Sequence, residues 1–179
     1  LSGALLVGDA LRAGLLERAL GRLGWVDSTL TTVKPFGQDL AKALLPANKS
    51  TPALTLSANL QWEGNSGSVE TIGHVTVMGV EDGFFGGDIP DGWPEEGVWL
   101  GSDRVAKPGG GPPRESLLGQ QASDQAVVEW ELPVRGRIGG LMDRYSPRSS
   151  LAPSRLVVVP LERLQVRLNL KGKANTLLA

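Results

Sequence analysis

Side chains able to perform acid–base or nucleophilic chemistry are sparse in this chain. Its 179 residues contain no Cys and a single His, His74. Thiolate nucleophiles, Cys-ligated zinc and multi-His metal sites are therefore excluded. A Ser–His–Asp triad would have to use His74, which lies inside the strand-like segment VETIGHVTVMGV, and no G-x-S-x-G nucleophile elbow is present. We interpret His74 as a half-exposed strand residue and predict no catalytic residue and no metal site.

Paired carboxylates provide the alternative route to catalysis. Glycosidases need two carboxylates that face one cleft. Glu129 and Glu131 are two residues apart on an expected strand, so they share a face, while Trp130 points toward the core. A strand with one solvated face explains the same pattern. A secreted or surface enzyme acting on carbohydrate or peptide stays as an alternative, with Glu129, Glu131, Glu95 and Asp91 as its candidate carboxylates.

The glycine-rich stretches and the charge balance argue against nucleotide and nucleic-acid binding. GGDIPDG and KPGGGPP have neither the dinucleotide-binding nor the P-loop spacing, and G-x-x-x-x-G-K-[ST] is absent. Lys and Arg number 18 against 19 Asp and Glu, for a formal net charge of −1, which supplies no basic field for a phosphate backbone. We expect no cofactor and no nucleic-acid partner.

One loop carries a cationic, partly aromatic patch. Arg144, Tyr145 and Arg148 lie in an expected polar loop over residues 143–154, with Arg155 next to it. A solvated loop is the simpler interpretation. The functional interpretation is a contact surface for an acidic partner or for anionic headgroups.

Hydrophobic periodicity indicates the elements that position these residues. Leucines spaced by three and four predict a helix over residues 4–24, whose leucine face must pack against something because Gly14 and Gly21 weaken the helix. Strict alternation predicts strands over 52–63 and 69–80, joined as an antiparallel hairpin. Further expected elements are strands over 25–33, 98–100, 126–134, 155–159 and 174–178, and short helices over 36–45, 102–106 and 161–168.

The central region differs in composition from both ends. Residues 81–150 are dense in Gly and Pro, as in PDGWPEEG and KPGGGPP. The predicted fold class is α+β, with a mixed-sheet lobe, a long N-terminal helix and an inserted second, Gly/Pro-rich β lobe. We predict that residues 1–80 form the first part of the core lobe, 81–150 the inserted smaller lobe, and 151–179 a closing strand–helix–strand.

The first residues are apolar and precede the first charge, Asp9. No stretch reaches the ~18–20 uninterrupted apolar residues that span a bilayer, and LSGALLVGDALR has no basic n-region and no cleavage-type ending of a signal peptide. The segment LSGALLVG, which opens on Leu1 and not on Met, is compatible both with the end of a membrane helix and with an artificial boundary.

Three stretches, in this order, resemble segments of FtsX/MacB/LolC-type ABC transporter permeases. VGDALRAGLLERALGRLGWVDSTL is similar to the segment after the first membrane helix, and TIGHVTVMGVEDGFF to a strand ending in GV(D/E)-x-x-F(F/W). LAPSRLVVVPLERLQVRLNLKGKANTLLA is similar to FVPL-x-x-LQ-x-x-L-x-L-x-G-(K/R)-AN-x-LL and is the most specific of the three. The family's LN-x-x-LA segment appears here as VWLGSDRVAK, with Gly101 where Asn is common, which leaves the role of that turn open.

The resemblance implies the MacB-like periplasmic core domain of a bacterial inner-membrane permease, a mixed α/β lobe with a second lobe inserted in it. Such a domain is non-catalytic. It lies outside the membrane between two membrane helices, and mechanotransmission couples ATP hydrolysis in the cytoplasm to the handling of a lipoprotein, small molecule or partner. Helix 4–24 would be a lever emerging from the lipid, with both ends of the domain facing one membrane.

The partners that the resemblance implies are an ABC ATPase subunit, through the rest of the permease, a periplasmic partner protein or lipoprotein, and a second copy in the intact transporter. A standalone adhesion or scaffold domain is a third alternative, beside the permease domain and the enzyme.

Overall fold

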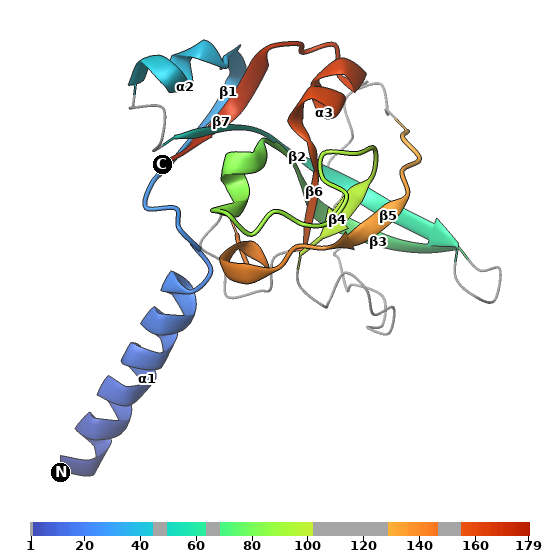
Figure 1. Ribbon diagram of the computed structural model, residues 1–179. Coiled ribbons are helices and arrows are strands. Elements are labelled where there is room, and N and C mark those ends of the chain that lie inside the picture. Colours follow the sequence, from blue (N-terminus) through green and yellow to red (C-terminus); the bar gives the residue numbers. More distant parts are fainter. Residues whose placement is uncertain (1, 45–49, 64–68, 102–128, 147–154) are drawn as a thin grey trace, which may run out of the picture.

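A computed structural model describes residues 2–44, 50–63, 69–101, 129–146 and 155–179 (Figure 1). Its centre is a mixed seven-stranded sheet of order β1-β7-β2-β3-β6-β4-β5. The strands are β1 (Thr29–Gly37), β2 (Thr51–Glu63), β3 (Val69–Val80), β4 (Val98–Leu100), β5 (Val134–Arg137), β6 (Leu156–Pro160) and β7 (Lys173–Leu178). The helices are α1 (Ser2–Leu20), α2 (Asp39–Leu44) and α3 (Leu161–Arg167), with 3₁₀ turns η1 (Asp82–Phe85) and η3 (Gly140–Met142). The α+β class with a mixed sheet is confirmed.

The hairpin of β2 and β3 contains the two longest strands of the sheet. Both strands have almost the predicted bounds, and they pair antiparallel from Leu54 opposite Gly79 to Glu63 opposite Val69. β6 pairs parallel with β3, so that Val80 lies opposite Pro160, and antiparallel with β4. The carboxyl ends of β3 and β6 therefore meet at one edge of the sheet.

Apolar side chains cover both faces of the sheet. Alternate residues of β6 point to opposite faces, so Leu156 and Val158 belong to one buried cluster and Val157 and Val159 to the other. The first cluster includes the phenylalanines of η1 and the side chains of Trp99, Met142 and Tyr145. The second includes Leu161 and Leu164 of α3. η1 and α3 therefore cover opposite faces.

Two predicted strands are displaced. The strand predicted over 25–33 begins only at Thr29, because Trp25 and Val26 pack into the core and are not part of the ladder. The strand predicted over 126–134 is wrong for its described part, since residues 129–133 have no regular structure and β5 begins at Val134. The helix predicted over 102–106 lies outside the described residues.

The predicted second lobe is not confirmed. The described parts of 81–150 contribute β4 and β5 to the common sheet, and Trp99 and Met142 to the core that also contains Met78 of β3. The rest of that region, residues 102–128 and 147–150, lies outside the description.

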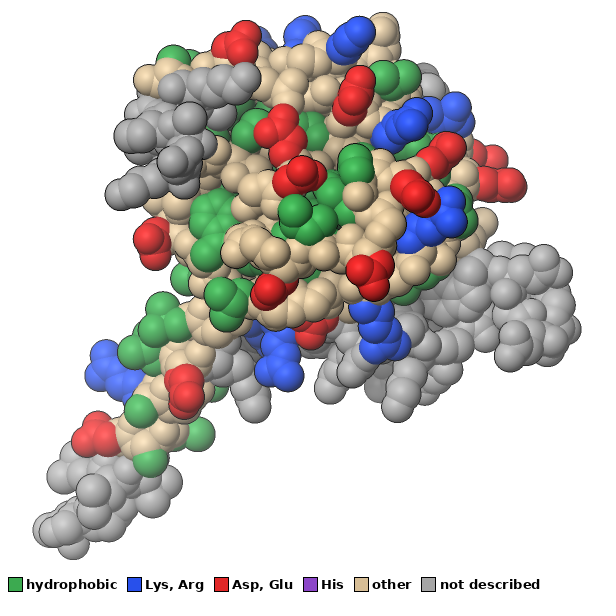
Figure 2. Space-filling view, viewed as in Figure 1, with side chains coloured by type: hydrophobic (Ala, Val, Ile, Leu, Met, Phe, Trp, Pro, Cys, Tyr) green, Lys and Arg blue, Asp and Glu red, His purple; other side chains and the backbone are tan. Residues whose placement is uncertain are grey.

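Helix α1 projects from the sheet as a rod (Figure 1). The expectation that a leucine face packs is wrong for the described residues: the side chains of Leu11, Leu16 and Leu20 are 66%, 59% and 56% exposed. Leu11 and Leu20 are about two and a half turns apart, so they point to opposite sides of the helix and form no single stripe. Hydrophobic side chains are visible along the rod in Figure 2. Among the described residues, no helix is long and apolar enough to cross a bilayer.

Candidate functional site: the α1 joint and the β3–β6 groove

The first candidate is the segment that joins α1 to the sheet, residues 21–28, called the joint below. After Leu23 donates its N–H to the carbonyl of Leu20, the chain reverses at Gly24, whose φ is +61°. Left-handed backbone favours glycine because it lacks a Cβ. A Cβ here would also meet Met142 Sδ and lie 3.2 Å from the carbonyl oxygen of Leu141. The local structure therefore requires glycine.

Trp25 anchors the joint to the core. Its Nε1 donates a hydrogen bond of 2.7 Å to the carbonyl of Phe84 in η1, and its ring packs against the buried cluster on that face. Val26, which follows, is 3% exposed. A residue pair at the base of α1 is thus held by both a directional bond and apolar burial.

The joint also touches the end of β7 and the turn after η3. The carbonyl of Ala179 accepts hydrogen bonds from the N–H groups of Asp27, at 2.7 Å, and Ser28, at 2.8 Å. The N–H of Ala179 donates to the carbonyl of Ser28, and that of Ser146 to the carbonyl of Arg22. Displacement of the base of α1 must therefore strain the end of β7 or break these bonds.

From β7 the contacts continue into the middle of the sheet. The side-chain amide of Asn175 accepts from the N–H of Thr55 and donates to its carbonyl, both at 2.7 Å. The β2–β7 ladder itself runs only from Thr51 to Ala53 on β2. The Asn175 amide thus connects the two strands at Thr55, two residues beyond the end of the ladder on β2. In the sequence, Asn175 belongs to the AN pair of the segment that resembles the permeases, and no local pattern indicates its bonding role.

The predicted contact patch next to the joint is not assembled as expected. Arg144 is exposed, and Arg148 lies outside the described residues. The prediction for Tyr145 is wrong: its side chain is 0% exposed and lies edge-to-face against Phe84, with ring centroids 5.6 Å apart. A buried ring offers no surface to a partner. The ring of Tyr145 packs in the core. The polar composition of the surrounding loop gave no indication of this burial.

The hydroxyl of Tyr145 is the unusual polar group of the core. Among the described residues it has no regular hydrogen-bond partner. Burial raises the pKa of Tyr145 above its usual value of 10, and the nearby Thr29 side chain offsets this rise in part.

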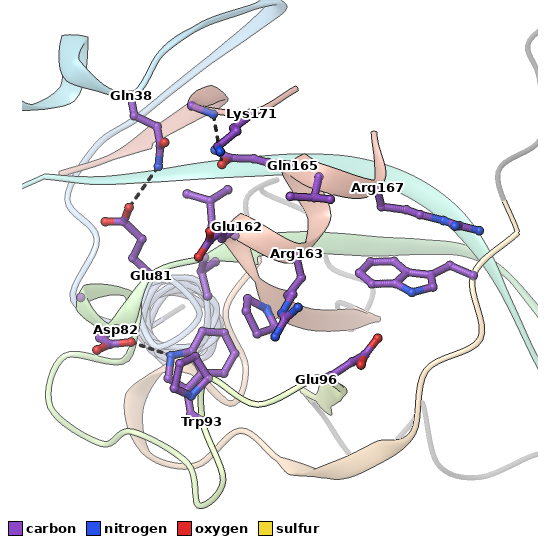
Figure 3. A pocket seen from close by; sticks show the side chains of 18 residues that line it. Gln38, Glu81, Asp82, Trp93, Glu96, Glu162, Arg163, Gln165, Arg167 and Lys171 are labelled. Atoms are coloured by element: carbon purple, nitrogen blue, oxygen red, sulfur yellow. Dashed lines mark hydrogen bonds between the residues drawn. The ribbon is translucent and has the colours of Figure 1, made fainter. Parts of the chain in front are cut away.

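The second candidate is a groove at the carboxyl ends of β3 and β6. From these parallel strands the chain leaves onto opposite faces, to η1 after Val80 and to α3 after Pro160. In open sheets, ligands bind in the crevice that such a divergence leaves. The groove has a volume of about 1030 Å³ (Figure 3).

Side chains of both charges line the groove, and on α3 the acidic Glu162 is next to Arg163 (Figure 3). Arg163, Arg167 and Lys171 are spaced by four residues on and after α3. Among the acidic lining residues, Glu81 accepts a hydrogen bond of 3.0 Å from Gln38 Nε2, and Asp82 one of 2.6 Å from Trp93 Nε1. No ion pair joins any two of these described lining side chains, although both signs of charge are present.

The carboxylates predicted for an enzyme lie elsewhere. None of Glu129, Glu131, Glu95 and Asp91 lines the groove. Glu95 forms an ion pair of 3.9 Å with Arg135, and both are largely exposed. Trp130, between the two other glutamates, packs on the core as predicted and also lines the groove.

His74 lies on β3 as predicted, exposed and with a φ of 56°. The part of the chain that the structure describes contains no group of three or more His, Asp or Glu that could hold a metal ion. No protein-family model, curated protein or solved structure matches this chain.

Proposed function

We propose that this chain is a non-catalytic extracytoplasmic domain of an FtsX/MacB-type ABC permease. It would couple ATP hydrolysis by a cytoplasmic ATPase to the handling of a lipoprotein, small molecule or partner protein outside the membrane. Three segments that resemble such permeases support the proposal. The observation that carries it is the joint, whose Asp27 and Ser28, between α1 and β1, are hydrogen-bonded to Ala179, the residue after β7.

The geometry of the joint suits a domain whose two ends both connect to the same membrane. A domain inserted between two membrane helices needs its entry and exit on the same side. Here Asp27 and Ser28 bond to Ala179, so the chain enters the sheet at β1 beside the end of β7, and the joint connects this point to α1 (Figure 1). A continuation of the chain beyond Ala179 would start next to the joint, at Asp27 and Ser28.

The rod and its anchorage suit the transmission of force. A helix of 19 residues is about 28 Å long at 1.5 Å per residue. Its base is fixed to η1 through Trp25, to the turn after η3 through Arg22, and to β7 through Ser28. Tilting of α1 would therefore load the sheet at its β7 side. The exposed leucines leave α1 free to pack against neighbouring parts of a transporter, including a second copy.

The placement outside the membrane can be tested by cysteine labelling, because the chain has no Cys. In the full-length protein, Val33→Cys introduces a thiol at a side chain that is 100% exposed on β1. Cells with a permeabilised outer envelope and an intact inner membrane should be labelled by a membrane-impermeant maleimide. Labelling only after the inner membrane is disrupted would contradict the proposal, as would a reading frame with no apolar segment of about 20 residues next to either end.

The coupling role has a separate test in the same full-length protein. Trp25→Phe keeps a ring in the core and removes the bond to Phe84. We expect ATP hydrolysis to continue while the activity that depends on the external domain falls. Leu11→Phe, on the exposed side of the rod, is the matched control. Equal effects of both substitutions would argue against the joint as the point of coupling.

A further inference from the structure

We propose that the β3–β6 groove binds an uncharged oligosaccharide, whose hydroxyl groups bond to the charged lining side chains and whose rings pack on Trp93 and Trp130. This inference goes beyond the proposed function and does not rest on it, because it uses only the residues that line the groove.

The mixture of charges in the groove argues against an ionic ligand. Among the described residues, three basic side chains line it together with four acidic ones, Glu81, Asp82, Glu96 and Glu162 (Figure 3). Because Glu162 is next to Arg163 on α3, a ligand with one sign of charge would be attracted and repelled within the same groove. An apolar ligand would take these groups out of water and give them no partner.

Hydroxyl groups suit such a lining because each of them both donates and accepts a hydrogen bond. A carboxylate only accepts, and a guanidinium or ammonium group only donates. A polyhydroxylated ligand therefore satisfies side chains of both kinds without carrying a charge itself. Among the described lining side chains, no ion pair occupies these donors and acceptors.

Two of the acceptors are held in place by the protein. Gln38 Nε2 donates to Glu81 at 3.0 Å, and Trp93 Nε1 donates to Asp82 at 2.6 Å. Each carboxylate keeps further acceptor capacity for a second donor. Holding these side chains in place lowers the entropy cost of binding a hydroxyl there.

Two half-buried tryptophans supply flat apolar surface to the same groove. Trp93 is held edge-to-face by Phe85 and Trp99, with ring centroids 4.8 and 4.9 Å from its own. Trp130 packs partly against the buried cluster beneath α3. A pyranose ring presents C–H groups on its faces and hydroxyls around its edge. Its faces can therefore pack on the electron-rich face of an indole while its edge reaches the polar side chains.

The size of the groove favours several sugar rings over one. Its volume of about 1030 Å³ lies at the upper end of the roughly 300–1,000 Å³ typical of small-molecule pockets, and it is open to solvent. Trp93 packs against the cluster on one face of the sheet and Trp130 against the cluster on the other. A chain of rings is therefore needed to contact both, and it can continue beyond the ends of the groove.

The test uses an array of immobilised neutral, carboxylated and sulfated oligosaccharides. The 179-residue protein carries a fluorophore at Val33→Cys, which is fully exposed and does not line the groove. We expect binding to neutral oligosaccharides, for which calorimetry with the free sugar should give a Kd below about 1 mM. Because the ligand is uncharged, the affinity should change by less than about twofold between about 50 and 300 mM NaCl.

Two variants with a matched control locate the site. Glu162→Ala/Arg163→Ala removes an acceptor and a donor at constant net charge and should weaken binding at least about tenfold. Trp130→Leu keeps an apolar contact with the core but removes the ring, and it should weaken binding to a similar extent. Asp9→Ala/Arg12→Ala removes an equal pair of charges from exposed positions on α1 and should leave the affinity unchanged. Circular dichroism checks that each variant folds, and the α3 pair decides alone if Trp130→Leu does not, because both of its side chains are exposed.

Each remaining result would overturn the proposal. These are binding to no glycan on the array, binding to carboxylated or sulfated glycans alone, an affinity that falls steeply as salt rises, an unchanged affinity in Glu162→Ala/Arg163→Ala, or an equal loss in Asp9→Ala/Arg12→Ala. None of them bears on which side of the membrane Val33→Cys is labelled in cells, so failure of this inference and failure of the proposed function are distinguishable.

Discussion

Helices α1 and α3 use their apolar residues in opposite ways. α3 has 7 residues, and its Leu161 and Leu164 are 2% and 3% exposed. α1 has 19 residues, yet Leu11 and Leu16 are 66% and 59% exposed. The short helix belongs to the core of the protein, whereas the long one carries surface that the described residues leave uncovered.

The difference shows what stabilises each helix. An isolated helix of seven residues is not stable in water, so α3 depends on packing. That packing is close: a Cβ on Gly79 of β3 would lie 2.9 Å from Leu164 Cδ2. α1 depends on its own backbone bonds and on the joint. Because the described leucines of α1 do not pack on the core, they are free to contact another surface. Substitutions in α1 should therefore affect stability less than substitutions in α3.

The largest expected difference is between two leucine truncations. Leu164→Ala removes a side chain from the core and should lower the free energy of unfolding by about 2–5 kcal/mol. Leu16→Ala on α1 removes an exposed side chain and should change it by less than about 0.5 kcal/mol. Urea unfolding of both variants measures the pair. A loss of 2 kcal/mol or more in Leu16→Ala, about the lower end expected for a buried leucine, would mean that α1 packs on the body after all.

Two glycines give the next contrast. Gly24→Ala puts a Cβ at a φ of +61°, against η3, and should cost about 2–4 kcal/mol from backbone strain and crowding. Gly14→Ala lies within α1 with nothing within 4 Å of the new Cβ, so it should stabilise the helix by up to about 1 kcal/mol. Thermal unfolding followed by circular dichroism measures both. If Gly24→Ala were as well tolerated as Gly14→Ala, the joint would not be a rigid connection.

The elements that the sequence predicted well are those whose pattern is local. Alternation over β2 and β3 defined both strands because one residue in two faces the core. Trp25 was misassigned because its alternation with neighbours resembles a strand. Its bond partner, Phe84, is 59 residues away, so no local pattern could reveal it. The leucine spacing on α1 likewise predicted a helix correctly but not that nothing covers it.

The groove was partly visible in the sequence. Arg163 and Arg167 have the four-residue spacing of a helix face, and Glu81 and Asp82 directly follow a predicted strand. What the sequence did not provide was the parallel pairing of β3 with β6, which brings Val80 next to Pro160 across a long connection. Without that pairing, these charged residues have no reason to line one groove.

Asn175 tests how firmly the joint is connected to the body through β7. Asn175→Ala leaves the N–H and the carbonyl of Thr55 without their partners and should cost about 1–3 kcal/mol. Hydrogen exchange should show faster exchange at Thr55, while amides of α3 remain protected. Lys173→Ala, on an exposed side chain of the same strand, is the control. If Asn175→Ala and Lys173→Ala unfolded at the same denaturant concentration, the two hydrogen bonds between Asn175 and Thr55 would not contribute to stability.

The smallest expected effect concerns Tyr145, which reports on packing beside the joint because Ser146 bonds to Arg22. It is the sole Tyr, so tyrosinate absorbance follows this residue alone. Its pKa lies above 10 in the folded protein because its side chain is buried, and near 10 in the unfolded chain. Below pH 10 the hydroxyl is protonated in both states, and its contribution to stability is fully present.

Between pH 10 and the raised pKa of folded Tyr145, the unfolded chain ionises first, so stability falls with rising pH by up to about 1.4 kcal/mol per pH unit. Tyr145→Phe should remove this part of the slope and change stability at pH 7 by no more than about 1 kcal/mol, since the hydroxyl has no regular partner among the described residues. In Gly24→Ala, the tyrosinate titration should shift down toward pH 10, because a displaced joint admits water to the ring. An unshifted titration in a clearly destabilised Gly24→Ala variant would show that the core beside the joint keeps its packing when the rod is disturbed, and the two regions would then be less tightly coupled than their hydrogen bonds indicate.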